Sequence, residues 1–425
     1  MNTLIERNVL THQFHDIRTQ TVRLCDPLRP EDFSAQPVEY VSPPKWHLGH
    51  TTWFFETFLL KPYKRGYTPF GKDYDFIFNS YYESVGKRTL KSNRGSFTRP
   101  TIEDVMEYRT HVDNAMGELL TIGQQLPSKA TEILAIGLNH EQQHQELLLY
   151  DIKYILGTNP LFPAYQNRVK NPQNGIDVLH DNTSQYINIP GGIYDIGHAG
   201  EGFCFDNELG RHKVLLQDFQ VQDRLVTNGE YLEFIEAGGY AQFQYWLSEG
   251  WQWVQENNIE APLYWHFIDD VWYTYTLEGL EKIKLDYPVA HISFFEADAF
   301  AQWKGQRLLT EFEWEVACNR LAPKIPAQAN LLEKDLLSPQ KQTMHDFQFY
   351  GDCWEWTSSA YRPYPHFKAA EGALGEYNGK FMINQMVLRG GSCATPLSHI
   401  RPSYRNFFHP HMRWAISGIR LAKDV

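Results

Sequence analysis

Cysteine is scarce and scattered in this sequence. The 425 residues include five cysteines, none of them in Cys-x-x-Cys spacing. A disulfide framework and a cysteine-based zinc knuckle both depend on suitably paired cysteines, so the pattern argues against them. We expect free thiols in a reducing compartment.

Runs of positively charged residues and long apolar segments are also lacking. The formal net charge is −12, and no run of lysine and arginine supplies the basic face that a phosphate backbone requires. The first thirty residues mix acids and bases and hold no apolar stretch of signal-peptide or membrane-span length. The sequence therefore predicts a cytoplasmic protein with neither a nucleic-acid nor a membrane partner.

The chain does contain enough apolar residues for two buried cores. Hydrophobic residues make up 42% of it and aromatic residues 15%, which at this length favours two globular domains. Helical spacing of apolar residues predicts a bundle in the first part of the chain. The segments are residues 4–25, 45–60, 101–122 and 132–156. Residues 167–183 are polar and read as a linker, beyond which short strands and turns dominate.

The last of these helical segments carries metal-binding chemistry in the stretch LNHEQQHQELLLYD. His140 and His144 are four residues apart, so on a helix they lie on the same face, where two imidazoles can bind one cation. A His-x-x-x-His pair alone is also compatible with surface or structurally satisfied histidines. The apolar run that follows places the helix in a core, where an imidazole without a partner costs free energy.

A third imidazole is available in WHLGHTTWFFE, from either His47 or His50. The spacing does not choose between these two residues. Three neutral imidazoles would leave a divalent cation with its charge uncompensated and with open coordination positions. This donor set is not the two-histidine, one-carboxylate triad usual for non-haem iron, and it could equally describe a zinc site.

Several motifs together resemble the ergothioneine-biosynthesis sulfoxide synthases, the EgtB family. They include KWHLGHTTWFFE, LNHEQQHQE, CWEWTSSAY, MVLRGGSCATP and RPSYRNFF. The resemblance spans nearly the whole chain and implies a multi-domain α and α+β fold. It implies an N-terminal DinB-like four-helix bundle over residues 1–166, which carries the metal ligands. It also implies a C-terminal formylglycine-generating-enzyme-like or C-type-lectin-like α+β domain over residues 184–425.

The same resemblance implies a metal and a reaction. Family members use iron(II) and dioxygen to join a thiol sulfur to C2 of the hercynine imidazole, with oxidation of the sulfur to a sulfoxide. By position, the implied iron ligands are His50, His140 and His144. The implied small-molecule partners are hercynine, a thiol donor and dioxygen.

The resemblance also assigns residues that handle the substrates. Tyr81 and Tyr82, in a long loop over residues 66–100, match the catalytic phenol of some members, and which of the two acts stays open. The implied substrate-binding residues are Gln143, Lys91, Arg94, Asn406, Phe407 and Phe408. Each of these also has an ordinary structural interpretation as a helix-surface amide, a solvated loop charge or a packed aromatic ring.

One difference between this sequence and some family members indicates the thiol donor. Members that use γ-glutamylcysteine carry a Trp–Asp pair where this chain has Phe407 and Phe408, so cysteine is the preferred donor. The alternatives are the same chemistry with γ-glutamylcysteine, histidine or a selenosugar, and a non-catalytic lectin-like binding protein stabilised by a metal. A formylglycine-generating enzyme is disfavoured because those enzymes bind copper through two cysteines near the C-terminus, and only Cys393 lies in the last seventy residues.

Overall fold

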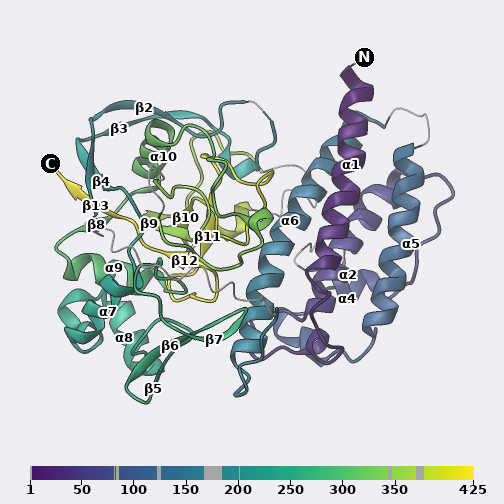
Figure 1. Cartoon of the computed structure of the whole chain (residues 1–425). Coiled ribbons are helices and arrows are strands. Elements are labelled where there is room, and N and C mark those ends of the chain that lie inside the picture. The colour runs from purple at the N-terminus through teal and green to yellow at the C-terminus, as the bar shows by residue number, and fades with distance from the viewer. Residues whose placement is uncertain are drawn as a thin grey trace. The chain divides into compact units, whose positions relative to one another are not determined.

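The chain folds into two compact units (Figure 1). The computed structural model describes residues 2–80, 82, 86–121, 126–166, 184–200, 202–342, 347–369 and 378–425, with the backbone alone for residues 2–8. The first unit runs to Leu161 and is helical, and the second combines Phe162–Ala369 with Asn378–Val425 and contains both sheets and helices. The predicted α and α+β fold class is confirmed, whereas the predicted linker lies outside the described residues.

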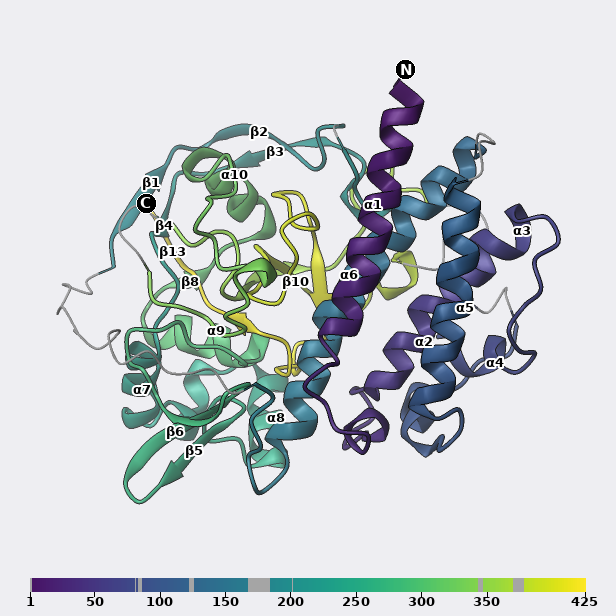
Figure 2. The same cartoon turned by 45° about the vertical axis from the view of Figure 1, so that its right-hand side comes forward.

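Long helices side by side build the first unit, as Figure 2 shows. They are α1 (Asn2–Arg23), α2 (Pro44–Phe55), α5 (Ile102–Thr121) and α6 (Ser128–Gly157). Helix α2 packs against both α5 and α6, and α1 packs against α6. All twelve residues of α2 are buried as a result. Within the described residues, no helix is both long and apolar enough to cross a membrane.

Helix α2 begins and ends with distinct local signals. Pro44 occupies its first turn, where the missing amide proton costs no hydrogen bond. At its other end the chain continues through a π-helical stretch, Glu56–Leu60, into α3 (Lys61–Tyr63). The long loop that follows contains α4 (Tyr74–Phe78), which packs against α2, and a 3₁₀ turn at Lys91–Ser96.

A buried carboxylate fixes three of these helices to one another. Glu141 of α6 is fully buried and accepts hydrogen bonds from Arg109 of α5 at 2.6 Å and from Arg18 of α1 at 3.0 Å. The hydroxyl of Thr21 donates to the same carboxylate at 2.7 Å. Because Glu141 directly follows His140 on α6, this ion-pair cluster also fixes the part of the helix that carries the histidines.

The described residues of the second unit form four small sheets. Two are four-stranded, in the orders β1-β4-β13-β8 and β11-β10-β9-β12, and the others are the β2-β3 hairpin and the β5-β6-β7 meander. The strands are β1 (Tyr186–Ile189), β2 (Gly192–Ile196), β3 (His212–Leu216), β4 (Phe219–Gln222), β5 (Trp265–Ile268), β6 (Val271–Thr276), β7 (Gly279–Lys282), β8 (Arg307–Leu308), β9 (Trp354–Ala360), β10 (Met386–Arg389), β11 (Asn406–Phe408), β12 (Ser417–Gly418) and β13 (Leu421–Asp424). Pairing is antiparallel except between β12 and β9.

The second unit also contains the helices α7 (Asn228–Glu236), α8 (Ser248–Asn257), α9 (Phe294–Trp303) and α10 (Glu311–Leu321). Helices α9 and α10 pack against strands, and α7, α9 and α10 each begin at a capping box. At the start of α10, Thr310 and Glu313 each accept a hydrogen bond from the other's backbone amide. Buried ion pairs such as Glu355 with Arg420, at 2.7 Å, lie among the β-strands.

Glu141→Gln is expected to lower the free energy of unfolding by roughly 3 kcal/mol, as breaking a buried ion pair does. Arg109 and Arg18 would each lose a compensating charge, although Arg18 keeps its ion pair with Asp113 at 2.7 Å. Urea denaturation measures the change. The matched control is Glu132→Gln, which makes the same change on the same helix at an exposed pair with Lys129 and should cost less than about 1 kcal/mol. Equal effects would contradict the stabilising role of Glu141.

The contribution of Glu141 should also depend on pH. Burial alone would raise the pKa of this carboxyl, but Arg109 and Arg18 lower it to about 2 from its ordinary 4.5. A lowered folded-state pKa means that the stabilisation is full above pH 4.5 and is lost as the pH falls towards 2. The difference in free energy of unfolding between the parent and Glu141→Gln should therefore narrow below pH 4.5. A difference that widens there would contradict this assignment.

Candidate metal centre

Three imidazoles from two helices converge inside the first unit. His50 comes from α2, and His140 and His144 lie one turn apart on α6. Their potential ligand atoms all lie within 4.8 Å of one another, and Nε2 of His50 is 3.2 Å from Nε2 of His140. Among the described residues, no other cluster of three or more histidine, cysteine or acidic side chains has this geometry.

Burial keeps these imidazoles neutral. It lowers the pKa of His140 to about 3 and lowers the pKa of His50 and His144 well below the ordinary value. The neighbouring rings add to the effect, because a positive charge on one would repel a charge on the next. A neutral imidazole offers a lone pair, which is the form that ligates a metal.

A backbone carbonyl orients the His50 ring. Nδ1 of His50 donates to the carbonyl oxygen of Phe78, at the end of α4, over 2.6 Å. With its proton on Nδ1, the ring presents Nε2 without a proton towards His140. The packing of α4 against α2 therefore helps to set which nitrogen faces the cluster.

His47, the other candidate in WHLGH, lies beside the cluster and not within it. Its Nδ1 is 2.9 Å from Nδ1 of His144, and its Nε2 is 2.9 Å from Oδ2 of Asp151. Glu146, also on α6, accepts a hydrogen bond from the hydroxyl of Tyr150. The structure thus groups His50 with both histidines of α6, whereas His47 hydrogen-bonds His144 and Asp151.

Aromatic rings enclose the histidines. The ring of Trp46 lies parallel to that of His50 within 12°, with centroids 4.5 Å apart, and Trp53 is within 17° at 5.6 Å. The ring of Phe54 lies 4.9 Å from that of His140. These rings make the surroundings apolar, which strengthens electrostatic interactions at the histidines.

The basic candidates differ in exposure. Arg94 is buried, its guanidinium lies 3.3 Å from the Trp46 ring centroid, and its terminal nitrogens donate to the hydroxyls of Ser42 and Ser80. Lys91 is exposed at the start of the same 3₁₀ turn. Gln143 is half-buried directly before His144 on α6. Arg94 is therefore the basic candidate that contacts Trp46, one of the aromatic rings beside His50.

Of the two candidate phenols, Tyr82 is described and Tyr81 lies outside the described residues. Tyr82 is fully buried. Its ring centroid lies 5.5 Å from that of Trp53 and 5.4 Å from that of Phe58. Its backbone is held by Asn79, whose side-chain oxygen accepts from the Tyr82 amide at 3.1 Å. Tyr82 therefore contacts Trp53, whose ring in turn lies beside that of His50.

Asn406, Phe407 and Phe408 form β11 in the second unit. The Phe407 ring stacks on Tyr361 with centroids 4.0 Å apart, and the Phe408 ring lies 4.8 Å from Trp414. The Asn406 side chain accepts a hydrogen bond from the Phe407 amide. All three are half-buried, so each keeps some surface accessible.

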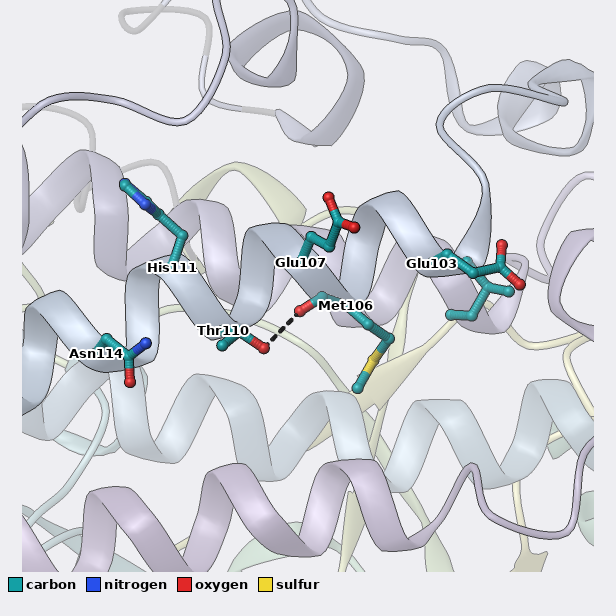
Figure 3. A pocket seen from close by; sticks show the side chains of 7 residues that line it. Glu103, Met106, Glu107, Thr110, His111 and Asn114 are labelled. Carbon is teal, nitrogen blue, oxygen red and sulfur yellow. Dashed lines mark hydrogen bonds between the residues drawn. The ribbon is translucent and has the colours of Figure 1, made fainter.

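A shallow hollow on α5 is a poorer candidate for a site. Its lining residues are Ile102, Glu103, Met106, Glu107, Thr110, His111 and Asn114. Figure 3 shows side chains that extend from one helix, where the Thr110 hydroxyl donates to the Met106 carbonyl at 2.9 Å. Side chains from a single helix surface do not surround a ligand, in contrast to the histidines from α2 and α6.

Comparisons with known proteins agree with the two-unit fold. Residues 13–148 match the family described as the DinB superfamily. Residues 176–333 and 338–425 match the family described as the sulfatase-modifying factor enzyme 1-like domain. The helical unit is therefore DinB-like and the α+β unit is formylglycine-generating-enzyme-like.

Two of the curated relatives match along nearly the whole chain. It is 31% identical to the hercynine oxygenase of Mycolicibacterium smegmatis, over 99% of this chain and 100% of the relative. It is 31% identical to the hercynine oxygenase of Mycobacterium tuberculosis, over 96% and 97% of the two chains. It is also 27% identical to ergothioneine biosynthesis protein 1 of Schizosaccharomyces pombe, over 62% of this chain and 31% of that protein. On this evidence the chain belongs to the EgtB family of hercynine oxygenases.

Proposed function

We propose that this protein is an iron(II)- and dioxygen-dependent sulfoxide synthase of ergothioneine biosynthesis, which joins cysteine sulfur to C2 of hercynine. The observation that carries the proposal is the cluster of three buried, neutral imidazoles, His50, His140 and His144. It occurs in a chain whose full-length relatives are named hercynine oxygenases.

The donor set fits a ferrous ion. Three imidazole nitrogens suit a divalent first-row metal, and neutral ligands leave its charge available to attract an anionic thiolate. Bound iron(II) would supply a redox centre for dioxygen activation and a Lewis acid for the thiolate sulfur. The chain's own contribution is to fix the ligands, as Phe78 does for His50, and to exclude bulk water with Trp46 and Trp53.

The reaction balances with dioxygen as the oxidant. The C2–H bond of hercynine and the S–H bond of cysteine break, and a C–S bond and an S–O bond form. One oxygen atom ends in the sulfoxide, and the other leaves as water with the two hydrogens. Replacing the C–H and S–H bonds by one C–S bond releases two electrons, and oxidation of a sulfur lone pair to the sulfoxide supplies two more. The substrates thus provide the four electrons that dioxygen takes up, and no further reductant is needed to give hercynylcysteine sulfoxide.

Other residues have proposed roles in holding the substrates. Arg94 presents a guanidinium that can bind a carboxylate through two hydrogen bonds, with Lys91 as an additional positive charge. The amide of Gln143 would hydrogen-bond hercynine. In the second unit, Asn406, Phe407 and Phe408 are further substrate-binding candidates, and the aromatic faces of the two phenylalanines would attract a trimethylammonium group that has no proton to donate. The proposed role of Tyr81 or Tyr82 is proton delivery from its hydroxyl.

The activity is tested by anaerobic loading with iron(II), followed by hercynine, cysteine and air, with mass spectrometry of the products. Hercynylcysteine sulfoxide is the expected product. Parallel reactions replace cysteine with γ-glutamylcysteine or a selenosugar, and hercynine with histidine. Full iron loading with no coupled product and no oxygen consumption would support the lectin-like alternative and overturn the proposal.

His140→Ala should lose iron and turnover together, because it removes one of three ligands. Iron per chain is measured after anaerobic loading and desalting. His111→Ala is the matched control, since this histidine lies on α5, outside the histidine cluster, and its Nε2 hydrogen-bonds the Thr68 carbonyl. It should keep both iron and activity. Unchanged iron content in His140→Ala would contradict the proposed ligand set.

Tyr82→Phe and Tyr81→Phe should both retain iron, because a phenol hydroxyl is removed and no ligand is. In one of them, sulfoxide formation should fall by about a hundredfold or more, the range for loss of a general acid, while cysteine sulfinate accumulates. The ratio of the two products, measured by mass spectrometry, identifies the acting residue. If neither variant changes the ratio, the two phenols have structural roles.

A further inference from the structure

A buried hydrogen-bond chain leads from a carboxylate to one of the clustered histidines. Oδ2 of Asp151 lies 2.9 Å from Nε2 of His47, and Nδ1 of His47 lies 2.9 Å from Nδ1 of His144. All three side chains are buried. The carboxylate is itself held in place, because the same Oδ2 accepts the backbone amide of Ser42 at 2.8 Å.

The positions of the protons follow from counting donors. A carboxylate oxygen can only accept, so Nε2 of His47 carries a proton. One proton must also lie between the two Nδ1 atoms, which are too close to face each other as bare lone pairs. If that proton belonged to His47, a neutral His144 would carry its own proton on Nε2 and could not ligate through that atom. A ligating His144 therefore carries its proton on Nδ1 and donates it to Nδ1 of His47.

We propose that His47 is a positioning residue for the metal centre: with Asp151 it locks His144 in the Nδ1–H tautomer, so that Nε2 of His144 faces the metal. This inference rests on the proposed function, because it assigns a purpose to the lone pair of His144. It also gives His144 an orienting partner comparable to the Phe78 carbonyl at His50.

The arrangement of residues on the two helices explains why the chain forms. On α2, His47 and His50 are three residues apart and share a face, so both are directed towards α6. On α6, Asp151 follows His144 by seven residues, or two turns, and also shares its face. His47 therefore lies between two side chains of α6 and hydrogen-bonds both. Such outer partners fix the orientation of a ligating imidazole and raise its basicity.

The tautomers can be read directly in the metal-free protein. Long-range proton–nitrogen correlation spectra of protein labelled with ¹⁵N in the histidine rings distinguish Nδ1–H from Nε2–H. His144→Gln and His47→Asn identify the two signals among the 17 histidines. The expected pattern is Nε2–H for His47 and Nδ1–H for His144. An Nε2–H signal for His144, or an Nδ1–H signal for His47, would overturn the proposal.

Two substitutions of His47 then test whether its Nδ1 acts as a hydrogen-bond acceptor or whether its ring only fills space. His47→Phe keeps a ring but removes the acceptor, and should weaken binding of iron(II) alone by about 10- to 100-fold. His47→Asn places Oδ1 near the position of the original Nδ1. It should restore the Nδ1–H tautomer of His144 and most of the affinity. Affinity is measured anaerobically by competition with a chelator, and far-UV circular dichroism checks that each variant is folded.

The outcomes distinguish this inference from the proposed function. The positioning role would be overturned if His47→Phe bound iron as tightly as the parent. It would also be overturned if both His47 variants bound iron equally weakly while the His144 tautomer stayed unchanged. Neither result would contradict iron binding by the parent protein. Failure of the parent to bind iron would overturn the proposed function, yet the metal-free spectrum would still test the tautomers. His111→Asn is the control for a histidine-to-asparagine change and should bind iron like the parent.

Discussion

Burial of several imidazoles between two helices is the constraint on which the first unit depends. Helix α2 has no exposed residue, so both of its histidines must find partners inside the protein. His50 donates to the Phe78 carbonyl, and His47 lies between His144 and Asp151. These hydrogen bonds restrict which nitrogen of a ring can carry the proton, while the potential ligand atoms of His50, His140 and His144 lie within 4.8 Å of one another.

The rest of the helical unit can be understood as support for that arrangement. Glu141 draws charged side chains from α1 and α5 onto the same turn of α6 that carries His140. Trp46 and Trp53 cover the His50 ring, and Arg94 lies over Trp46. A polar cluster is thus held by an ion-pair network on one side of α6 and by aromatic packing around α2. Such double support limits the movement of the histidines relative to one another.

Much of this was predictable, for reasons specific to each residue. Helical periodicity predicted α1, α2, α5 and α6, and the spacing of His140 and His144 predicted that they share a face. Spacing alone did not choose between His47 and His50, because both lie on one face of α2 and only the tertiary packing separates their partners. The family resemblance chose His50, and the structure groups His50 with His140 and His144.

Other features were not predicted. The partners of Glu141 are distant in sequence, so no local pattern reveals them. A signal existed for Asp151, which shares a face with His144 two turns earlier, but a single acidic residue at that spacing is common on helices. In the second unit, α8, α10 and the β5-β6-β7 meander were not predicted. The pair Thr310 and Glu313 would have indicated the start of α10, since this spacing is a capping box.

We propose that histidines from α2 and α6 together hold one ferrous ion. X-ray absorption spectroscopy at the iron edge, on protein loaded anaerobically and free of substrates, tests it most directly. The expected spectrum shows multiple scattering from three imidazoles and no sulfur neighbour, in agreement with the cluster of His50, His140 and His144. A spectrum with fewer imidazoles, or with a cysteine sulfur bound to iron, would contradict it.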